Sequence, residues 1–172
     1  IGCMQTPCAG NEKVLGKETL TLCDVPKNVV IIGAGPAGLE AARVATLRKH
    51  KVILFDKGNE VGGQNLIAAK AAGRQEIQGV TRWLSNQVNK LNIDLRLNCT
   101  ATLDMILDEN PDTVIVATGS LPKEKPFPGE YQFPQVVSSV QILTGEITAG
   151  PKVIVIDLNG HHHGTGTAEF LA

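Results

Sequence analysis

The residues most suited to chemistry are six consecutive ones, Gly33-Ala34-Gly35-Pro36-Ala37-Gly38, whose spacing is G-x-G-x-x-G. In a turn of this kind Gly33 permits the tight turn, Gly35 lets the backbone approach a pyrophosphate, and Gly38 lets helix and strand pack closely. The backbone N–H groups and the positive end of the following helix dipole attract phosphate. Gly33, Gly35, Pro36, Ala37 and Gly38 are therefore candidate contacts of a dinucleotide.

The neighbouring sequence predicts the elements that such a turn needs. Asn28–Ile32 is a short, mostly apolar run typical of a buried central strand, and Pro36–Lys49 has apolar residues at helical spacing. Val52–Phe55 predicts a second buried strand, which completes a parallel βαβ unit. Asp56 follows Gly38 by 18 positions, where a carboxylate accepts hydrogen bonds from ribose hydroxyls and disfavours the 2′-phosphate of NADP. The alternative is a glycine-rich turn without a ligand, in which Asp56 is a helix or turn cap.

The rest of the pattern predicts an α/β fold: an open, mostly parallel, three-layer Rossmann-like sheet that is incomplete, with its first strand central. We expect a helix at Arg74–Lys90, strands at Ile93–Leu97, Thr113–Ala117 and Lys152–Ile156, a loop at Leu121–Phe133, a helical turn at Val140–Leu143 and a helix at Thr167–Ala172. The type of Thr102–Leu107 stays open. Of these strands, Thr113–Ala117 and Lys152–Ile156 are expected to be buried, and Lys152–Ile156 to fill the open sheet edge, in the same chain or in a homodimer.

Composition narrows the class of protein. The 172 residues include 16 Lys and Arg against 17 Asp and Glu, a net charge of −1, with 42% hydrophobic residues. This balance argues against disorder and against a nucleic-acid partner. No apolar stretch is long enough to span a membrane, so we expect a cytoplasmic protein. A short-chain dehydrogenase is excluded because Tyr131, the only tyrosine, is followed four positions later by Gln135 instead of lysine.

Several segments occur together along the chain: Ile1-Gly2-Cys3 with the later Cys8 and Cys23, Val30–Gly38, Val61-Gly62-Gly63-Gln64, and Ala117-Thr118-Gly119. This ordered combination resembles the flavin module of the 2,4-dienoyl-CoA reductase and trimethylamine dehydrogenase family, old yellow enzyme-like NADH:flavin oxidoreductases. The resemblance covers essentially the whole chain. It implies a fragment that lacks the FMN-binding (β/α)8 barrel, in a parent enzyme that passes electrons between NAD(P)H, FAD, a [4Fe-4S] cluster and FMN.

The resemblance also implies a division of the chain and a set of cofactor contacts. Residues 1–26 are then a cysteine-containing arm, 27–150 the first part of the FAD-binding domain, and 151–172 the start of an inserted NAD(P)-type domain. FAD, or ADP alone, is the implied ligand, and no residue of the fragment is a catalytic acid, base or nucleophile, so the isolated fragment is expected to be inactive. Further implied contacts are Asp56, Lys57, Gly63, Gln64, Ala117, Thr118, Gly119 and Arg74, the last of which is equally compatible with a solvated helix residue.

Two clusters of possible ligands leave alternatives open. The resemblance makes Cys3, Cys8 and Cys23 iron-sulphur ligands of the parent, although their gaps are longer than in the family; otherwise they are exposed thiols. Cys99 is expected to be a small buried hydrophobe. In Asp157–Gly166 an aspartate replaces the first glycine of a second turn, which disfavours NADH there, and His161–His163 indicate a solvated loop in preference to a metal site.

Two other functions also compete with a flavin module. The same turn fits a module that holds ADP as a structural group without redox work, and it fits an NAD-dependent dehydrogenase. The segments Gly62-Gly63-Gln64 and Ala117-Thr118-Gly119 argue against the dehydrogenase, because they belong to the flavin resemblance.

Overall fold

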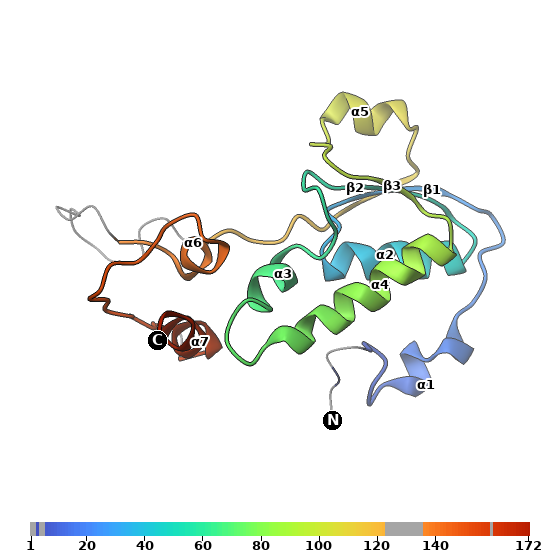
Figure 1. Ribbon diagram of the computed structural model, residues 1–172. Helices are drawn as coiled ribbons and strands as arrows, with labels where there is room; N and C mark the ends of the chain where they lie inside the picture. The colour runs from blue at the N-terminus through green and yellow to red at the C-terminus, as the bar shows by residue number, and fades with distance from the viewer. Residues whose placement is uncertain (1–2, 4–5, 123–135, 159) are drawn as a thin grey trace. The chain divides into compact units, whose positions relative to one another are not determined.

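A computed structural model describes residues 3, 6–122, 136–158 and 160–172 (Figure 1). Along the chain the elements are α1 (Glu12–Leu15), η1 (Lys17–Thr19), β1 (Asn28–Ile32), α2 (Pro36–Leu47), β2 (Lys51–Phe55), α3 (Gln64–Ala68), η2 (Gln75–Ile77), α4 (Gln78–Lys90), β3 (Asp94–Arg96), α5 (Leu103–Asp108), β4 (Thr113–Val116), α6 (Ser139–Thr144) and α7 (His162–Leu171). Ile1, Gly2, Tyr131 and most of the predicted loop Leu121–Phe133 lie outside the described residues.

The chain divides into two compact units. Unit 1 comprises residues 1–63 and 78–119, and unit 2 comprises residues 64–77 and 120–172. Unit 1 contains all four strands, while unit 2 contains α3, η2, α6 and α7. The three sequence ranges that we assign to the arm, the FAD-binding domain and the inserted domain stay predictions.

The sheet of unit 1 confirms the predicted fold class. Its strand order is β3-β2-β1-β4, and every neighbouring pair is parallel. β1 lies between β2 and β4, with Asn28 opposite Lys51 and Val29 opposite Thr113. The first strand is therefore central, as its continuous apolar run predicts.

The core lies mainly between the sheet and helices α2 and α4, which cover one face (Figure 1). The strand residues on this face alternate along β1 and β2, and they pack against a fully buried leucine of α2, Leu39. From α4 the core receives Val80, Leu84 and Val88, spaced four residues apart on one helix face. Trp83 of the same helix is 44% exposed, and its ring lies 5.3 Å from the guanidinium of Arg43.

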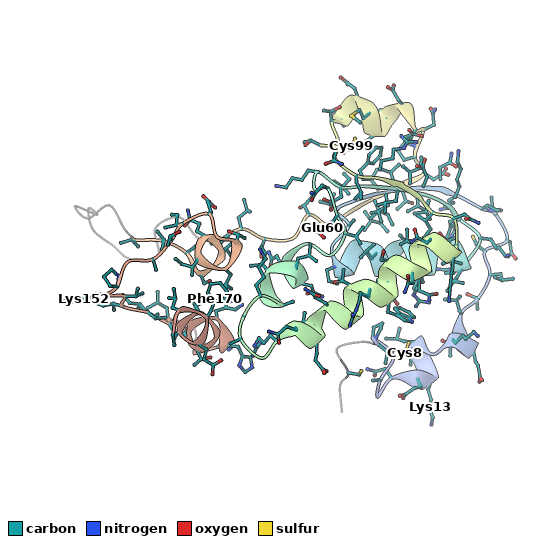
Figure 2. The ribbon with its side chains drawn as sticks, viewed as in Figure 1. Cys8, Lys13, Glu60, Cys99, Lys152 and Phe170 are labelled. Carbon is teal, nitrogen blue, oxygen red and sulfur yellow. The ribbon has the colours of Figure 1, made fainter. Side chains whose placement is uncertain are left out.

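Helix α5 covers the other face of the sheet, which makes the fold three-layered (Figure 1). Val30, Ile53 and Phe55 form this smaller cluster, and Met105 and Ile106 of α5 pack against it. Cys99, labelled in Figure 2, is half-buried against the same cluster, close to the small hydrophobe that we expect there. The type of Thr102–Leu107, open from the sequence, is thus settled as a helix capped by Thr102.

Two arginines of unit 1 form ion pairs with carboxylates, Arg96 with Asp94 and Glu109, and Arg43 with Glu40 on its own helix. Hydrogen bonds to Asp94 and then to Glu109 raise the pKa of Arg96, whose guanidinium also lies 5.2 Å from the Phe55 ring centroid. A bidentate bond to Glu40 raises the pKa of Arg43 on α2. Both arginines are partly exposed, so their ion pairs orient side chains more than they stabilise the fold.

The structure corrects two strand predictions. β4 is not buried: Val114 is 41% and Val116 is 70% exposed, because only one neighbouring strand and little of any helix covers it. Lys152–Ile156 is not a strand, and Ile154 is 88% exposed. An apolar run forms a strand only when a neighbour accepts its backbone hydrogen bonds, and in the described part of the chain no strand pairs with this run or with the outer edge of β4.

Other predicted boundaries shift by several residues. The helix expected from Arg74 begins as a 3₁₀ turn at Gln75 and becomes α-helical at Gln78. The helix expected from Thr167 begins five residues earlier, at His162. Within the described residues, no helix combines the length and the apolar character needed to cross a membrane.

A leucine pair tests the location of the core. Leu39 is fully buried and Leu103 is 69% exposed, so Leu39→Ala is expected to lower the free energy of unfolding by about 2–5 kcal/mol and Leu103→Ala by less than about 0.5 kcal/mol. Urea titration followed by circular dichroism measures both. Equal losses would show that α2 does not pack on the sheet as described.

Candidate dinucleotide-binding site

The turn between β1 and α2 requires a glycine at its first position. Gly33 has φ of 106°, a conformation that residues with a side chain rarely adopt. A Cβ at this position would collide with the carbonyl oxygen of Ala117, at the end of β4. Gly33 is therefore fixed both by backbone conformation and by contact with the neighbouring strand.

The third glycine is fixed by close packing within unit 1. Gly38 lies in the first turn of α2 and is buried. A Cβ there would collide with the carbonyl oxygen of Gly33 and would lie 3.4 Å from the Cβ of Ala117. The start of α2 consequently rests directly on the ends of β1 and β4, as the predicted role of this glycine requires.

The second glycine is not required by the fold. Gly35 has φ of −72° and ψ of 178°, which any residue adopts, and no atom lies within 4 Å of a Cβ built on it. It is the N-cap of α2, followed by Pro36 at the first helical position. Packing in unit 1 thus does not require a glycine here, although glycine suits an N-cap, while an open approach to the positive end of a 12-residue helix suits a phosphate.

Two further turns meet the first one. Gly62 donates a backbone hydrogen bond to the carbonyl of Ala34 at 2.8 Å, and a Cβ on Gly63 would lie 3.2 Å from the Cα of Gly35. Ala117 donates to the carbonyl of Ile32 at 2.8 Å. The three turns follow β1, β2 and β4, so they gather at the carboxyl ends of parallel strands, where open α/β sheets bind ligands.

Asp56 braces the turn from the end of β2. Its Oδ2 accepts a hydrogen bond from the backbone N–H of Ala34 at 2.5 Å, and its Oδ1 accepts one from Gly58 at 2.7 Å. Sequence reasoning assigned this carboxylate to a ribose or to a cap. The geometry shows the bracing role directly, and each oxygen keeps a second lone pair for a hydroxyl group. Lys57, the next residue, is exposed.

The remaining predicted contacts divide between the units. Thr118 and Gly119 are exposed at the end of β4 in unit 1. Gln64 and Arg74 belong to unit 2. Gln64 donates from Nε2 to the carbonyl of Ser120 at 2.5 Å, whereas the backbone N–H of Arg74 donates to Ala71.

Two residues of these turns, Gly62 and Ser120, were not among the predicted contacts. Gly62 is one, although it stands in the quoted Val61–Gln64 segment, and its bond to Ala34 explains its place there. Ser120 is the other, since its Oγ also accepts from Gln64 at 3.1 Å. Only its position directly after Ala117-Thr118-Gly119 signals it.

The cysteines of the arm do not form a site. The thiol of Cys8, labelled in Figure 2, donates to the carbonyl of Leu15 at 2.7 Å, and that of Cys23 donates to Val25 at 3.0 Å. Cys3 is exposed. Among the residues that the structure describes, no group of three or more His, Cys, Asp or Glu side chains is placed to hold a metal ion. The cysteines as placed therefore do not fit a [4Fe-4S] cluster, and their ligation in the parent stays a prediction.

The three histidines are exposed, as expected of a solvated loop, but two of them, His162 and His163, belong to a helix. His161 is the N-cap of α7, and His162 and His163 form its first turn. Helical spacing points neighbouring side chains in different directions, and all three are exposed. They do not converge as metal ligands do.

A hollow in unit 1 lies at the opposite end of the sheet. It holds about 320 Å³ and is lined by residues at the amino ends of β1 and β4 and along α2: Lys27, Val29, Ala41, Val44, Ala45, Arg48, His50, Thr113 and Ile115. Because ligands of such sheets bind at the carboxyl ends of strands, this hollow is separate from the candidate site.

Comparisons with known proteins agree with this geometry. Residues 27–156 match the family model described as pyridine nucleotide-disulphide oxidoreductase. The chain is 37% identical over 99% of its length to the N,N-dimethylglycine/sarcosine dehydrogenase of Chromohalobacter salexigens, and 42% identical over 91% of its length to the bilirubin reductase of Mediterraneibacter gnavus. It covers 25% and 24% of those two proteins, so it spans about a quarter of the length of the curated relatives.

A solved structure extends the likeness to three dimensions. The chain superimposes with a TM-score of 0.85 and 34% identity on a 2-naphthoyl-CoA reductase solved with 2-naphthoyl-CoA. The match covers 99% of this chain and 25% of that protein.

The unequal roles of the glycines give a stability test. Gly38→Ala places a methyl group against the Gly33 carbonyl oxygen and is expected to lower the free energy of unfolding by about 1–3 kcal/mol or more. Gly35→Ala, which meets open space, is expected to cost less than about 1 kcal/mol, because alanine is only a poorer N-cap. Urea unfolding distinguishes them. A larger loss at Gly35 than at Gly38 would contradict the described packing.

Asp56 gives a second test. Asp56→Ala removes the acceptor of two backbone N–H groups, so a loss of about 1–3 kcal/mol in unfolding free energy is expected. Glu60→Ala, at an exposed position of the same loop, is the control and is expected to change little. The bracing role is refuted if the two variants unfold at the same urea concentration.

Proposed function

Because this chain belongs to the pyridine nucleotide-disulphide oxidoreductase family, we propose that the Gly33–Gly38 turn binds the ADP part of FAD. The observation that carries the proposal is the open Gly35. Gly33 and Gly38 are explained by contacts within unit 1, whereas Gly35 has ordinary backbone angles and no atom within 4 Å of the position that a Cβ would take. An N-cap accepts glycine but favours Ser, Asn or Asp more, so the close approach of a ligand to the backbone is a physical reason for glycine in particular.

The charges around the turn support a pyrophosphate with a ribose beside it. The start of α2 has no acidic residue in its first turn, so its dipole is available to a phosphate. Asp56 lies within hydrogen-bond distance of Ala34, inside the same turn, and a carboxylate there favours ribose hydroxyls over a 2′-phosphate. We therefore infer that NADP binds this turn poorly.

The proposed contacts follow from these positions. Gly33, Gly35, Pro36, Ala37 and Gly38 would surround the pyrophosphate, with Asp56 and Lys57 at the ribose. Gly63, Ala117, Thr118 and Gly119 would line the turns that meet there, and Gln64 and Arg74 are further proposed contacts of the dinucleotide. FAD supplies the redox chemistry when bound; the residues of this chain bind it, orient its adenosine end and exclude water from the turn.

The whole protein is proposed to be a multidomain flavin oxidoreductase. The chain matches oxidoreductases over about a quarter of their length, so the parent would add the segments that bind a second flavin, FMN, and its substrate. Electrons would pass between a nicotinamide, FAD and FMN, in a cytoplasmic enzyme. The proposal includes no step through an iron-sulphur cluster held by Cys3, Cys8 and Cys23, because these residues do not converge.

Ligand titration of the 172-residue chain tests the proposal. ADP and FAD are expected to raise its unfolding temperature, by the equivalent of about 2.7 kcal/mol at a concentration 100 times the dissociation constant, whereas NADP is expected to have little effect. Gly35→Val is expected to abolish the shift and keep the fold. Gly150→Val is the matched control, because Gly150 also has open space around it and lies outside the turn.

Each result has a clear meaning. An ADP response that survives Gly35→Val would place the site elsewhere and refute the proposal. A response to ADP but not to FAD would support a structural ADP module, while a preference for NAD would support a dehydrogenase.

A further inference from the structure

We propose that Asp157 is a built-in anion at the start of α7, and that it keeps pyridine dinucleotides from binding to unit 2. The description of the chain's family names a pyridine nucleotide. Lys152–Leu171 has the order of segments expected for a site that binds one: an apolar run, a glycine-rich turn and a helix. The residues of this turn do not fit a pyrophosphate. The inference concerns unit 2 and stands independently of FAD binding in unit 1.

Asp157 follows the apolar run Val153–Ile156 directly, as Gly33 follows β1. In unit 1 this position permits the tight turn that brings α2 to the strand ends, with Pro36 starting the helix three residues later. In unit 2 the helix starts at His162, five residues after Asp157. The second turn is thus longer and carries an acidic side chain where the first has none.

The side chain of Asp157 lies against the first turn of α7. A Cβ built on Gly164, in the first turn of α7, would lie 2.6 Å from the Cβ of Asp157 and 2.9 Å from its Oδ2. The carboxylate therefore lies directly against the start of the helix. Its Oδ1 also accepts a hydrogen bond from the backbone N–H of Gly160 at 3.0 Å, which holds it in place.

This contact explains the glycine at position 164. The backbone of Gly164 is not in the left-handed region, so the turn itself does not require glycine there. The aspartate side chain occupies the space of its missing Cβ. Gly35 is the opposite case: no protein atom lies within 4 Å of its missing Cβ. One helix start in this chain has open space at its glycine, and the chain's own carboxylate lies against the first turn of the other.

The electrostatic consequence follows from the helix dipole. The amino end of a helix attracts one anion, and a carboxylate that lies there already receives that attraction. A pyrophosphate brought to the same place would have to displace Asp157 or lie beside it, where like charges repel at close range. Asp157 is therefore a specificity-determining residue that excludes NADH and NADPH. The nicotinamide of the proposed electron path then binds outside unit 2.

The test uses amide hydrogen exchange in the 172-residue protein and two variants. Asp157→Asn removes the charge and keeps the shape of the side chain. Glu169→Gln removes one charge at an exposed position farther along the same helix and is the matched control. Amides of residues 162–165 are expected to exchange several-fold faster in Asp157→Asn than in the wild type, with no change in Glu169→Gln. Inorganic phosphate is expected to slow them again in Asp157→Asn only.

A second measurement addresses the dinucleotide directly. With the unit 1 turn blocked by Gly35→Val, millimolar NADH or NADPH is expected to leave both the unfolding temperature and the exchange of residues 157–166 unchanged. Protection of these residues by either dinucleotide would overturn the inference. So would wild-type exchange in Asp157→Asn, because the carboxylate would then not be the anion of α7. Loss of ADP binding in unit 1 would leave both readouts intact.

Discussion

The structure of unit 1 depends on one close approach between backbones, in which the first turn of α2 lies against the ends of β1 and β4. Gly33 and Gly38 have no side chains, and a methyl group at either would collide with a carbonyl oxygen. This contact fixes where the helix begins and directs its amino end toward the strand ends. Gly62 donates a backbone hydrogen bond to Ala34, and Ala34 donates one to the carboxylate of Asp56. These two bonds attach the turn after β2 to the same place. Gly33 and Gly38 allow the close packing of α2 on the strand ends. The proposed phosphate site at Gly35 is a consequence of that packing.

Local patterns predicted the parts of the fold that local sequence determines. The apolar runs of β1 and β2, the helix spacing of α2 and the glycine turn were all found because each is complete within a few residues. Burial of β4 and pairing of Lys152–Ile156 were predicted wrongly, because both depend on which neighbours cover a strand, and an apolar run does not contain that information. The early start of α7 was missed since glycines lower helix propensity, while the contact between Asp157 and Gly164 that accompanies this start is visible only in three dimensions.

The candidate site shows the same division. The spacing of residues identified the three glycines and Asp56. The roles of the glycines came from the motif alone, and Asp56 was expected either to bind ribose or to cap a helix or turn. The structure separates Gly35, which the fold leaves open, from Gly33 and Gly38, which it requires, and shows Asp56 bonded to the turn itself. The same comparison distinguishes the two helix starts of the chain, since α2 is open to an anion and α7 carries its own.

The central claim is that the space at Gly35 receives a phosphate of an adenine dinucleotide. Its most direct test is a proton–nitrogen correlation spectrum of the chain during titration with ADP. The account predicts saturable shifts of the backbone amides of Gly35, Ala37 and Gly38, with those of Gly145 and Gly150 unchanged. Saturable binding that leaves the amides of residues 33–38 in place, or no binding at all, would contradict it.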